Sequence, residues 1–151
     1  MKRIRLALIL LISLSILLLT FGCRADYPYP FDQSFDNIEQ VSLHRVEESH
    51  PHGWYAETTW VEDIELESAK EMLGKLKDLE VRKHFGDSMI DYGNYLLYIS
   101  YLDETAEVVG WPNSASIDTE GNWTRKIVYF HHEEWTAVVS QYVETDLTAE
   151  L

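Results

Sequence analysis

The alternation of apolar and polar side chains predicts a β-hairpin in the first half of this chain. Residues 38–46 and residues 54–61 both show the period of two that is typical of a strand with one buried face. The residues between them, Ser-His-Pro-His-Gly at 49–53, have the composition of a turn. The two strands are therefore expected to pair with each other.

The strongest β signal lies at residues 95–102, where both faces are apolar. A strand that is apolar on both faces is expected near the centre of a sheet. Three further strand segments follow it after turn sequences, at residues 106–111, 115–117 and 123–130. A shorter candidate lies at residues 81–84. This order of short strands predicts an antiparallel meander.

Two segments have the 3.6-residue period of an amphipathic helix. The first covers residues 69–79, with a capping box at Ser68 and Glu71 that predicts the helix start. Its apolar stripe consists of Ala69, Met72, Leu73, Leu76 and Leu79. The second covers residues 133–143, with Trp135, Val138, Val139 and Tyr142 on one side. Because strands and helices do not alternate, we expect an α+β fold, with an antiparallel sheet of about five to six strands and two helices packed on one face.

The N-terminal pattern is that of a secretory signal. Lys2, Arg3 and Arg5 precede an uncharged, leucine-rich run at residues 6–22. That run is near the lower limit for crossing a hydrocarbon core of about 30 Å, so an uncleaved membrane anchor is the alternative. We expect a signal peptide at residues 1–22, followed by three further parts of the chain. These are a tether at 23–36, one α+β domain at 37–145 and a C-terminal tail at 146–151.

The sequence Leu19-Thr20-Phe21-Gly22-Cys23 resembles the lipobox of bacterial lipoproteins. It departs from the usual pattern because Thr20 stands where leucine is common and Phe21 is bulky. The resemblance implies cleavage before Cys23, a lipid on that cysteine, and a location on the extracytoplasmic face of a cell membrane. Cys23 is the only cysteine in the chain, so it has no partner for an internal disulfide.

The rest of the chain resembles, more diffusely, the small uncharacterised lipoproteins common in Gram-positive bacteria. The similarity covers roughly residues 37–143. It lies in a tyrosine-rich strand around Ile99, an acidic turn, and a final helix that carries Trp135. This resemblance implies the same lipid anchor and carries no known activity.

The charge of the chain narrows the choice of partners. The formal net charge is −14, and removal of residues 1–22 leaves 9 Lys and Arg against 26 Asp and Glu, a net charge of −17. Such a chain repels phosphate backbones and anionic lipid surfaces, so we expect no nucleic-acid partner. A cationic partner is permitted. The apolar content of 46% is that of a folded chain, and 129 residues suit a single domain.

Standard catalytic motifs are absent from the sequence. The seven glycines form neither a Walker loop nor a dinucleotide-binding fingerprint, and there is no nucleophile elbow. The histidines carry the one metal hypothesis, since His50 and His52 share a turn and His131 and His132 precede the last helix. These imidazoles would bind zinc or another transition metal if the two segments met in space. The alternative is two unrelated surface turns, and we expect no cofactor.

The aromatic content suggests a binding surface. Four tryptophans on or beside predicted strands are the candidates: Trp54, Trp60, Trp111 and Trp123. The leading functional hypothesis is a non-enzymatic module that binds a protein, peptide or cell-wall ligand through the open face of its sheet. The alternatives are an accessory subunit of an envelope complex, recognised by a large exposed apolar patch, and a small hydrolase with convergent ionisable groups in a pocket.

Overall fold

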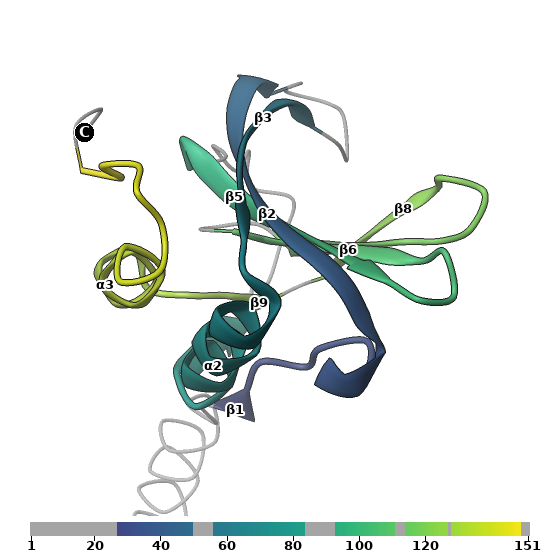
Figure 1. The fold of residues 1–151 in the computed structure, drawn as a ribbon, viewed down its shortest axis with the longest axis horizontal. Coiled ribbons are helices and arrows are strands. Elements are labelled where there is room, and N and C mark those ends of the chain that lie inside the picture. Colours follow the sequence, from purple (N-terminus) through teal and green to yellow (C-terminus); the bar gives the residue numbers. More distant parts are fainter. Residues whose placement is uncertain (1–26, 50–55, 84–92, 111–113, 127, 149–151) are drawn as a thin grey trace, which may run out of the picture.

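The computed structural model of the chain describes residues 27–49, 56–83, 93–110, 114–126 and 128–148 (Figure 1). Six strands form the main sheet: β2 (Ile38–Ser49), β3 (Ala56–Ile64), β5 (Tyr95–Tyr101), β6 (Ala106–Gly110), β7 (Ser114–Ile117) and β8 (Trp123–Lys126). Their order is β3-β2-β5-β6-β7-β8, and every neighbouring pair is antiparallel. The predicted pairing of the first two strands and the meander after β5 are confirmed.

A second, smaller sheet and two helices complete the fold. The small sheet has the order β1-β4-β9, with β1 (Tyr27–Pro28), β4 (Glu80–Lys83) and β9 (Val128–Tyr129). The helices are α2 (Leu66–Lys77) and α3 (His132–Val139), with a short 3-10 turn η1 (Phe35–Asn37) before β2. Both helices lie on the same side of the main sheet (Figure 1). The fold is therefore α+β, as the sequence pattern predicted.

The core lies between this sheet face and the two helices. Val41 and Leu43 of β2 and Leu97 and Ile99 of β5 are fully buried and belong to it. The helix α2 contributes Ala69, Met72, Leu73 and Leu76, all buried, with Leu79 partly buried beside them. Four members of the predicted stripe are thus in the core, because their spacing places them on one side of the helix.

The start of α2 was predicted wrongly. The helix begins at Leu66, and Glu65 caps it by accepting a hydrogen bond of 2.9 Å from the amide of Ser68. Only one residue separates the end of β3 from the helix, so Glu65 is the only residue available as the cap. Glu71, the other half of the predicted capping box, accepts instead from the hydroxyl of Tyr142 at 2.8 Å. This bond joins α2 to the segment after α3.

The end of α3 also differs from the prediction of a helix to residue 143. The helix ends at Val139, where the amides of Gln141 and Tyr142 bond to carbonyls three residues back rather than four. Tyr142 and Val143 still pack partly buried against the core. The apolar period therefore predicted correctly that Tyr142 packs on the core, but it predicted a helix that is too long.

The described parts of the segments expected to be a tether and a tail, residues 27–36 and 146–148, both pack on the domain. Tyr29 is only 1% exposed and belongs to the main core, and Phe31 and Phe35 pack against it. Leu147, near the other end, is also buried. The predicted strand at residues 123–130 is divided between the two sheets, with β8 in one and β9 in the other. The predicted hairpin turn falls largely at residues 50–55, outside the described residues.

Candidate functional site

On β2 and β3, one row of side chains points away from the helices. Because side chains alternate along a strand, Gln40, Ser42 and His44 lie on the face opposite the core residues Val41 and Leu43. Ser42 and His44 face neighbours on β3 across the ladder: Ser42 pairs with Asp63 and His44 with Trp60. This side of the sheet is the open face on which the binding hypothesis depends.

A β-bulge brings Trp60 and Asp63 onto the same face. Leu43 pairs with Glu62 and His44 with Trp60, so Val61 is left without a partner on β2. Without the bulge, two residues separated by three positions would lie on opposite faces. The sequence pattern therefore identified Trp60 and missed Asp63, since no turn residue or glycine marks the bulge.

Trp60 is an exposed aromatic residue whose orientation is fixed. Its side chain is 56% exposed, and its indole Nε1 donates to Asp63 Oδ1 at 2.9 Å. The same oxygen accepts from Gln40 Nε2 at 2.7 Å. This bond restrains the indole ring, and a binding residue gains from a ring that is fixed before the ligand arrives. We call this region the Trp60 patch; it comprises Gln40, Ser42, His44, Thr58, Trp60 and Asp63.

His44 forms the floor of the Trp60 patch. Its Nε2 lies 3.0 Å from Ser42 Oγ and its Nδ1 lies 3.2 Å from Thr58 Oγ1, so both ring nitrogens are engaged. The ring also lies beside that of Tyr98, with centroids 5.4 Å apart. Partial burial lowers the pKa of His44 below its usual value, although the carboxylate of Asp63 opposes the shift. At neutral pH the imidazole is uncharged, and Asp63 is then the one charged side chain of the patch.

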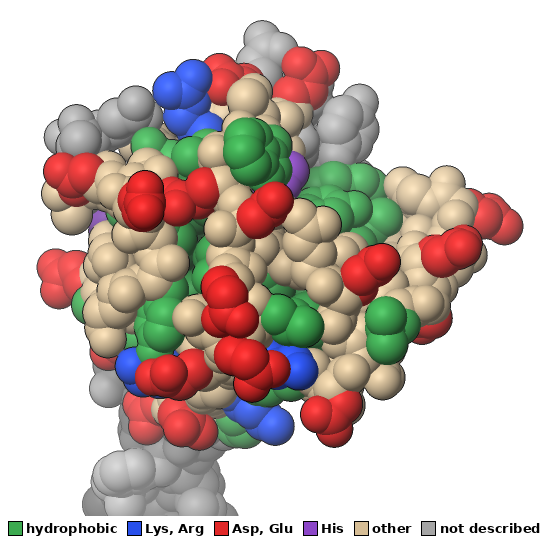
Figure 2. Space-filling view, in the orientation of Figure 1, with side chains coloured by type: hydrophobic (Ala, Val, Ile, Leu, Met, Phe, Trp, Pro, Cys, Tyr) green, Lys and Arg blue, Asp and Glu red, His purple; other side chains and the backbone are tan. Residues whose placement is uncertain are grey.

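The other half of this face is a second small core. Its buried residues come from β5, β6 and β7: Leu96, Ala106, Val108, Ala115 and Ile117. Trp123 packs on them partly buried, as do Val46 and Tyr98. Figure 2 shows hydrophobic side chains gathered on the side away from the helices, between the body of the domain and the β7–β8 hairpin. Trp123 therefore has a packing role, and it does not belong to an exposed binding surface. Trp54 and Trp111 lie outside the described residues.

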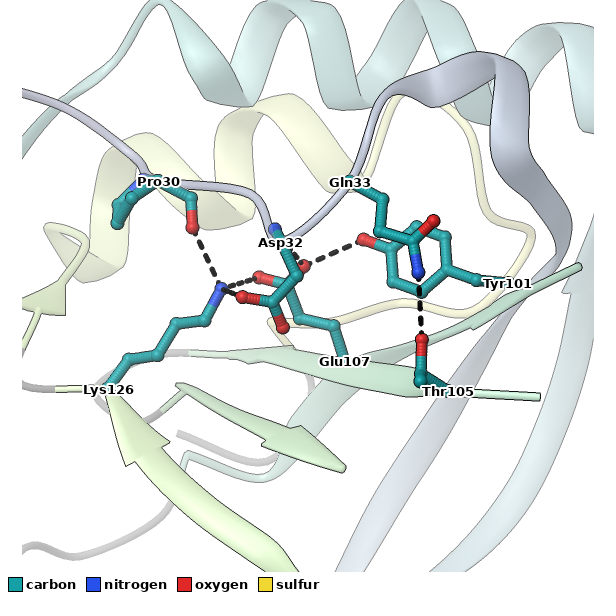
Figure 3. Close-up of polar contacts among 7 residues, drawn as sticks. All are labelled: Pro30, Asp32, Gln33, Tyr101, Thr105, Glu107 and Lys126. Carbon is teal, nitrogen blue, oxygen red and sulfur yellow. Dashed lines mark hydrogen bonds and ion pairs between the residues drawn. The ribbon is translucent and has the colours of Figure 1, made fainter. Parts of the chain in front are cut away.

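A cluster of buried polar groups lies on the helix-facing side of the sheet, around Glu107 (Figure 3). Glu107 has no exposed surface and accepts hydrogen bonds from Tyr101 OH at 2.8 Å and from the amide of Asp32 at 3.1 Å. Lys126 donates to Glu107 Oε1 and forms contacts with Asp32 Oδ1 at 2.9 Å and the carbonyl of Pro30 at 2.8 Å. These groups tie the N-terminal segment to β6 and β8, and we call them the Glu107 clasp.

The clasp raises the pKa values of the two tyrosines near it, Tyr29 and Tyr101. Burial, together with the negative charge of Glu107, raises the pKa of Tyr29 and of Tyr101 well above the usual value. The hydroxyl of Tyr101 donates to Glu107. The buried hydroxyls of Tyr29 and Ser114 lie close to each other, and that of Tyr29 also lies close to Glu107, but neither hydroxyl forms a hydrogen bond of good geometry. Both phenols therefore stay neutral at any physiological pH.

Lys126 of the clasp and the neighbouring Ser114 are residue types that occur in catalytic sites, but their arrangement here does not suit catalysis. Ser114 and Lys126 face each other across β7 and β8, as a serine nucleophile and a lysine base would. However, three oxygens already use the three N–H donors of the Lys126 ammonium, and Ser114 is only 2% exposed. A substrate has no access to that hydroxyl. The cluster is a structural connection between the N-terminal segment and the sheet.

The metal hypothesis depends partly on segments outside the described residues. His131 precedes α3 and His132 is its first residue, whereas His50 and His52 are not among the described residues. In the described ranges, no group of three or more His, Cys, Asp or Glu side chains is placed to hold a metal ion. A zinc site built from all four histidines stays a prediction.

The predicted lipidation residue, Cys23, also lies outside the described part of the chain. None of the helices between residues 27 and 148 that the structure describes has both the length and the apolar character needed to cross a membrane. Comparisons of the chain with protein-family models, with curated proteins and with solved structures gave no match.

Proposed function

We propose that the chain is an envelope lipoprotein, anchored by a lipid on Cys23, whose domain binds a ligand through the Trp60 patch. The lipobox-like sequence before Cys23 supports the anchor. The binding role rests on one observation, the 56% exposure of a tryptophan ring that Asp63 holds in one orientation. Exposed and fixed aromatic residues are common anchors in binding sites, because they offer contact area at a small cost in entropy.

The described residues favour a binding module over an accessory subunit. Their only large hydrophobic side chains with exposed surfaces are Trp60 and Leu102. Leu102 follows β5 at a turn, on a different strand from Trp60. A subunit of a stable complex would present a contiguous apolar patch of several hundred Å². A hydrolase is less favoured still, because the one buried ionic cluster within the described ranges is the inaccessible Glu107 clasp.

The anchor is tested by Cys23→Ser in the native host. We expect the variant to lose the lipid, and mass spectrometry of the membrane and soluble fractions would show the uncleaved precursor or a released form. If the variant and the parent both stay in the membrane at full-length mass, the uncleaved anchor replaces the lipid.

The binding role is tested by placing a photo-crosslinking amino acid at position 60 in the full-length protein in its own membranes. We expect a crosslinked product from position 60 and none from position 102, the exposed control. Equal crosslinking from the two positions would contradict a specific site at the patch.

A further inference from the structure

The Trp60 patch is not distinguished from the rest of the chain by its charge. Asp63 is the one carboxylate among the six patch residues, the same proportion as the 26 acidic residues among the 151 of the chain. A cationic ligand would be attracted to carboxylates over the whole domain, so charge does not direct it to this place. A ligand that selects the patch must recognise its aromatic ring and its neutral polar groups. The net charge of −14 also disfavours an anionic ligand.

The patch offers little to a protein partner. Protein interfaces bury about 800 Å² on each side and have an apolar centre. On this face the apolar residues next to the patch, such as Leu96 and Val108, are already buried in the second core. Trp60 is then a single exposed apolar group among polar side chains. That combination suits a small ligand which is polar at its edges and apolar on one flat side.

Sugars have this combination of surfaces. The C–H groups on one side of a pyranose ring carry a small positive charge, which is attracted to the negative face of an indole. The hydroxyls at the ring edge require fixed donors and acceptors, which are few in a small-molecule site. In the patch, Asp63 Oδ1 already accepts from Trp60 and Gln40, and no described residue donates to Asp63 Oδ2 or to Gln40 Oε1. These two oxygens are acceptors available to sugar hydroxyls.

We propose that the Trp60 patch is a binding site for a neutral saccharide, which stacks on the Trp60 indole and donates hydroxyl hydrogen bonds to Asp63 and Gln40. This inference rests on the proposed function, since it names the ligand class of the same site. The bond from Nε1 to Asp63 holds the ring before the ligand arrives, so binding loses less side-chain entropy. His44, with both ring nitrogens engaged, supports the strand beneath the ligand.

The test uses the full chain in detergent micelles and titrates it with a neutral oligosaccharide, chitotetraose or cellotetraose, while the indole N–H signals are followed by NMR. We expect saturable binding that shifts the signal assigned to Trp60. Trp60→Ala should weaken binding at least about tenfold, as is common for an aromatic anchor, and Trp60→Phe should weaken it less. Leu102→Ala is the control, because it removes an exposed hydrophobic side chain outside the patch and should leave affinity unchanged. The indole spectrum and circular dichroism of each variant report whether it is folded.

Asp63→Asn separates a saccharide from a cationic ligand. The amide oxygen can still accept from Trp60, and the amide can still bond a hydroxyl, so saccharide affinity should change less than about threefold. A lysine-rich peptide titrated in parallel should bind the parent weakly, with strong dependence on salt. If the peptide binds more tightly than the sugars, and Asp63→Asn abolishes its binding, the ligand is cationic and the proposal is overturned.

The saccharide proposal and the proposed function fail in different ways. No saturable sugar binding up to about 10 mM overturns the saccharide, since that limit corresponds to a negligible affinity. If crosslinking at position 60 in native membranes still exceeds that at position 102, the binding role survives with another ligand class. If neither sugar binding nor preferential crosslinking is found, both proposals are wrong.

Discussion

Removal of the Lys126 ammonium is the most direct test of the Glu107 clasp. In Lys126→Met, three oxygens lose their donor, but they differ in access to water. Asp32 is about one-third exposed and the Pro30 carbonyl is on an exposed residue, so water can replace the lysine at both. Glu107 has no exposed surface and stays as a buried carboxylate without its counter-ion. Leaving such a charge unpaired costs about 3–5 kcal/mol, so we expect a loss of that size in the free energy of unfolding.

The measurement is urea unfolding of the full chain, followed by circular dichroism, with the free energy obtained by linear extrapolation. Lys75→Met is the matched control, because Lys75 pairs with Glu71 at 3.1 Å while 44% of its side chain is exposed. An exposed pair of this kind is worth at most about 1 kcal/mol. Lys126→Met combined with Glu107→Gln should recover at least about 2 kcal/mol, since no charge is then left buried. A cost below about 1 kcal/mol for Lys126→Met, or a double variant no better than the single one, would refute the reasoning.

Three further predictions use the same unfolding assay. Tyr101→Phe should cost about 1–2 kcal/mol because it removes a donor to a buried carboxylate. Tyr29→Phe should cost less than Tyr101→Phe, because the Tyr29 hydroxyl forms no hydrogen bond of good geometry. Glu62→Gln should cost about 0.5–1 kcal/mol at pH 7. Burial opposes ionisation of Glu62, but hydrogen bonds from Thr145 and Glu144 lower its pKa. Its contribution should therefore disappear as the pH falls below about 4.5, and a difference from the parent that persisted at pH 3 would contradict this assignment. Leu73→Ala should cost about 2–5 kcal/mol, as expected for a fully buried leucine, and a loss below 1 kcal/mol would place Leu73 outside the core.

Most of the fold could be predicted because the apolar period is strong where the core is. The strand β5 was recognised from its two apolar faces, and it does contribute to both cores: Leu97 and Ile99 to one, Leu96 to the other. The stripe on α2 was recognised for the same reason. In each case the side chains that define the pattern are the ones buried, so binary patterning and tertiary structure agree.

The N-terminal segment and the clasp could not be predicted from periodicity. Tyr29 and Phe31 lie among prolines, and the segment has no regular period, so it was interpreted as a tether. Glu107 is one of 26 carboxylates, and only the ladder places it where Lys126 and Tyr101 can reach it. Such contacts depend on residues far apart in the chain, which local patterning does not report.

The candidate site was half predicted, and the bulge explains the missing half. Trp60 was identified as an aromatic residue on a strand, together with Trp123. The structure separates them, because Trp123 packs on the second core while Trp60 is exposed beside Asp63. The carboxylate shares that face only because Val61 is an extra residue in β3. Strict alternation along the strand assigns Asp63 to the face opposite Trp60. The hydrogen bond that holds the Trp60 ring could therefore not have been recognised from the sequence.

The packing of residues 27–37 changes what a lipid on Cys23 would do to the domain. A free tether of 13 residues would reach about 45 Å, whereas only four Cα-to-Cα steps separate Cys23 from Tyr27, at most about 15 Å. Under the proposed anchor the domain is therefore held close to the bilayer, because the pairing of β1 with β4, the burial of Tyr29 and the Glu107 clasp all hold this segment on the domain. Lys126→Met removes only the clasp, so we expect the segment to stay in place and the distance to the bilayer to change little. Energy transfer from a dye on Leu102→Cys to a dye in the membrane would measure that distance, with Lys75→Met as the control. Lower transfer in Lys126→Met than in Lys75→Met would show that the clasp alone sets the distance, and that the strand pairing and the buried tyrosine do not.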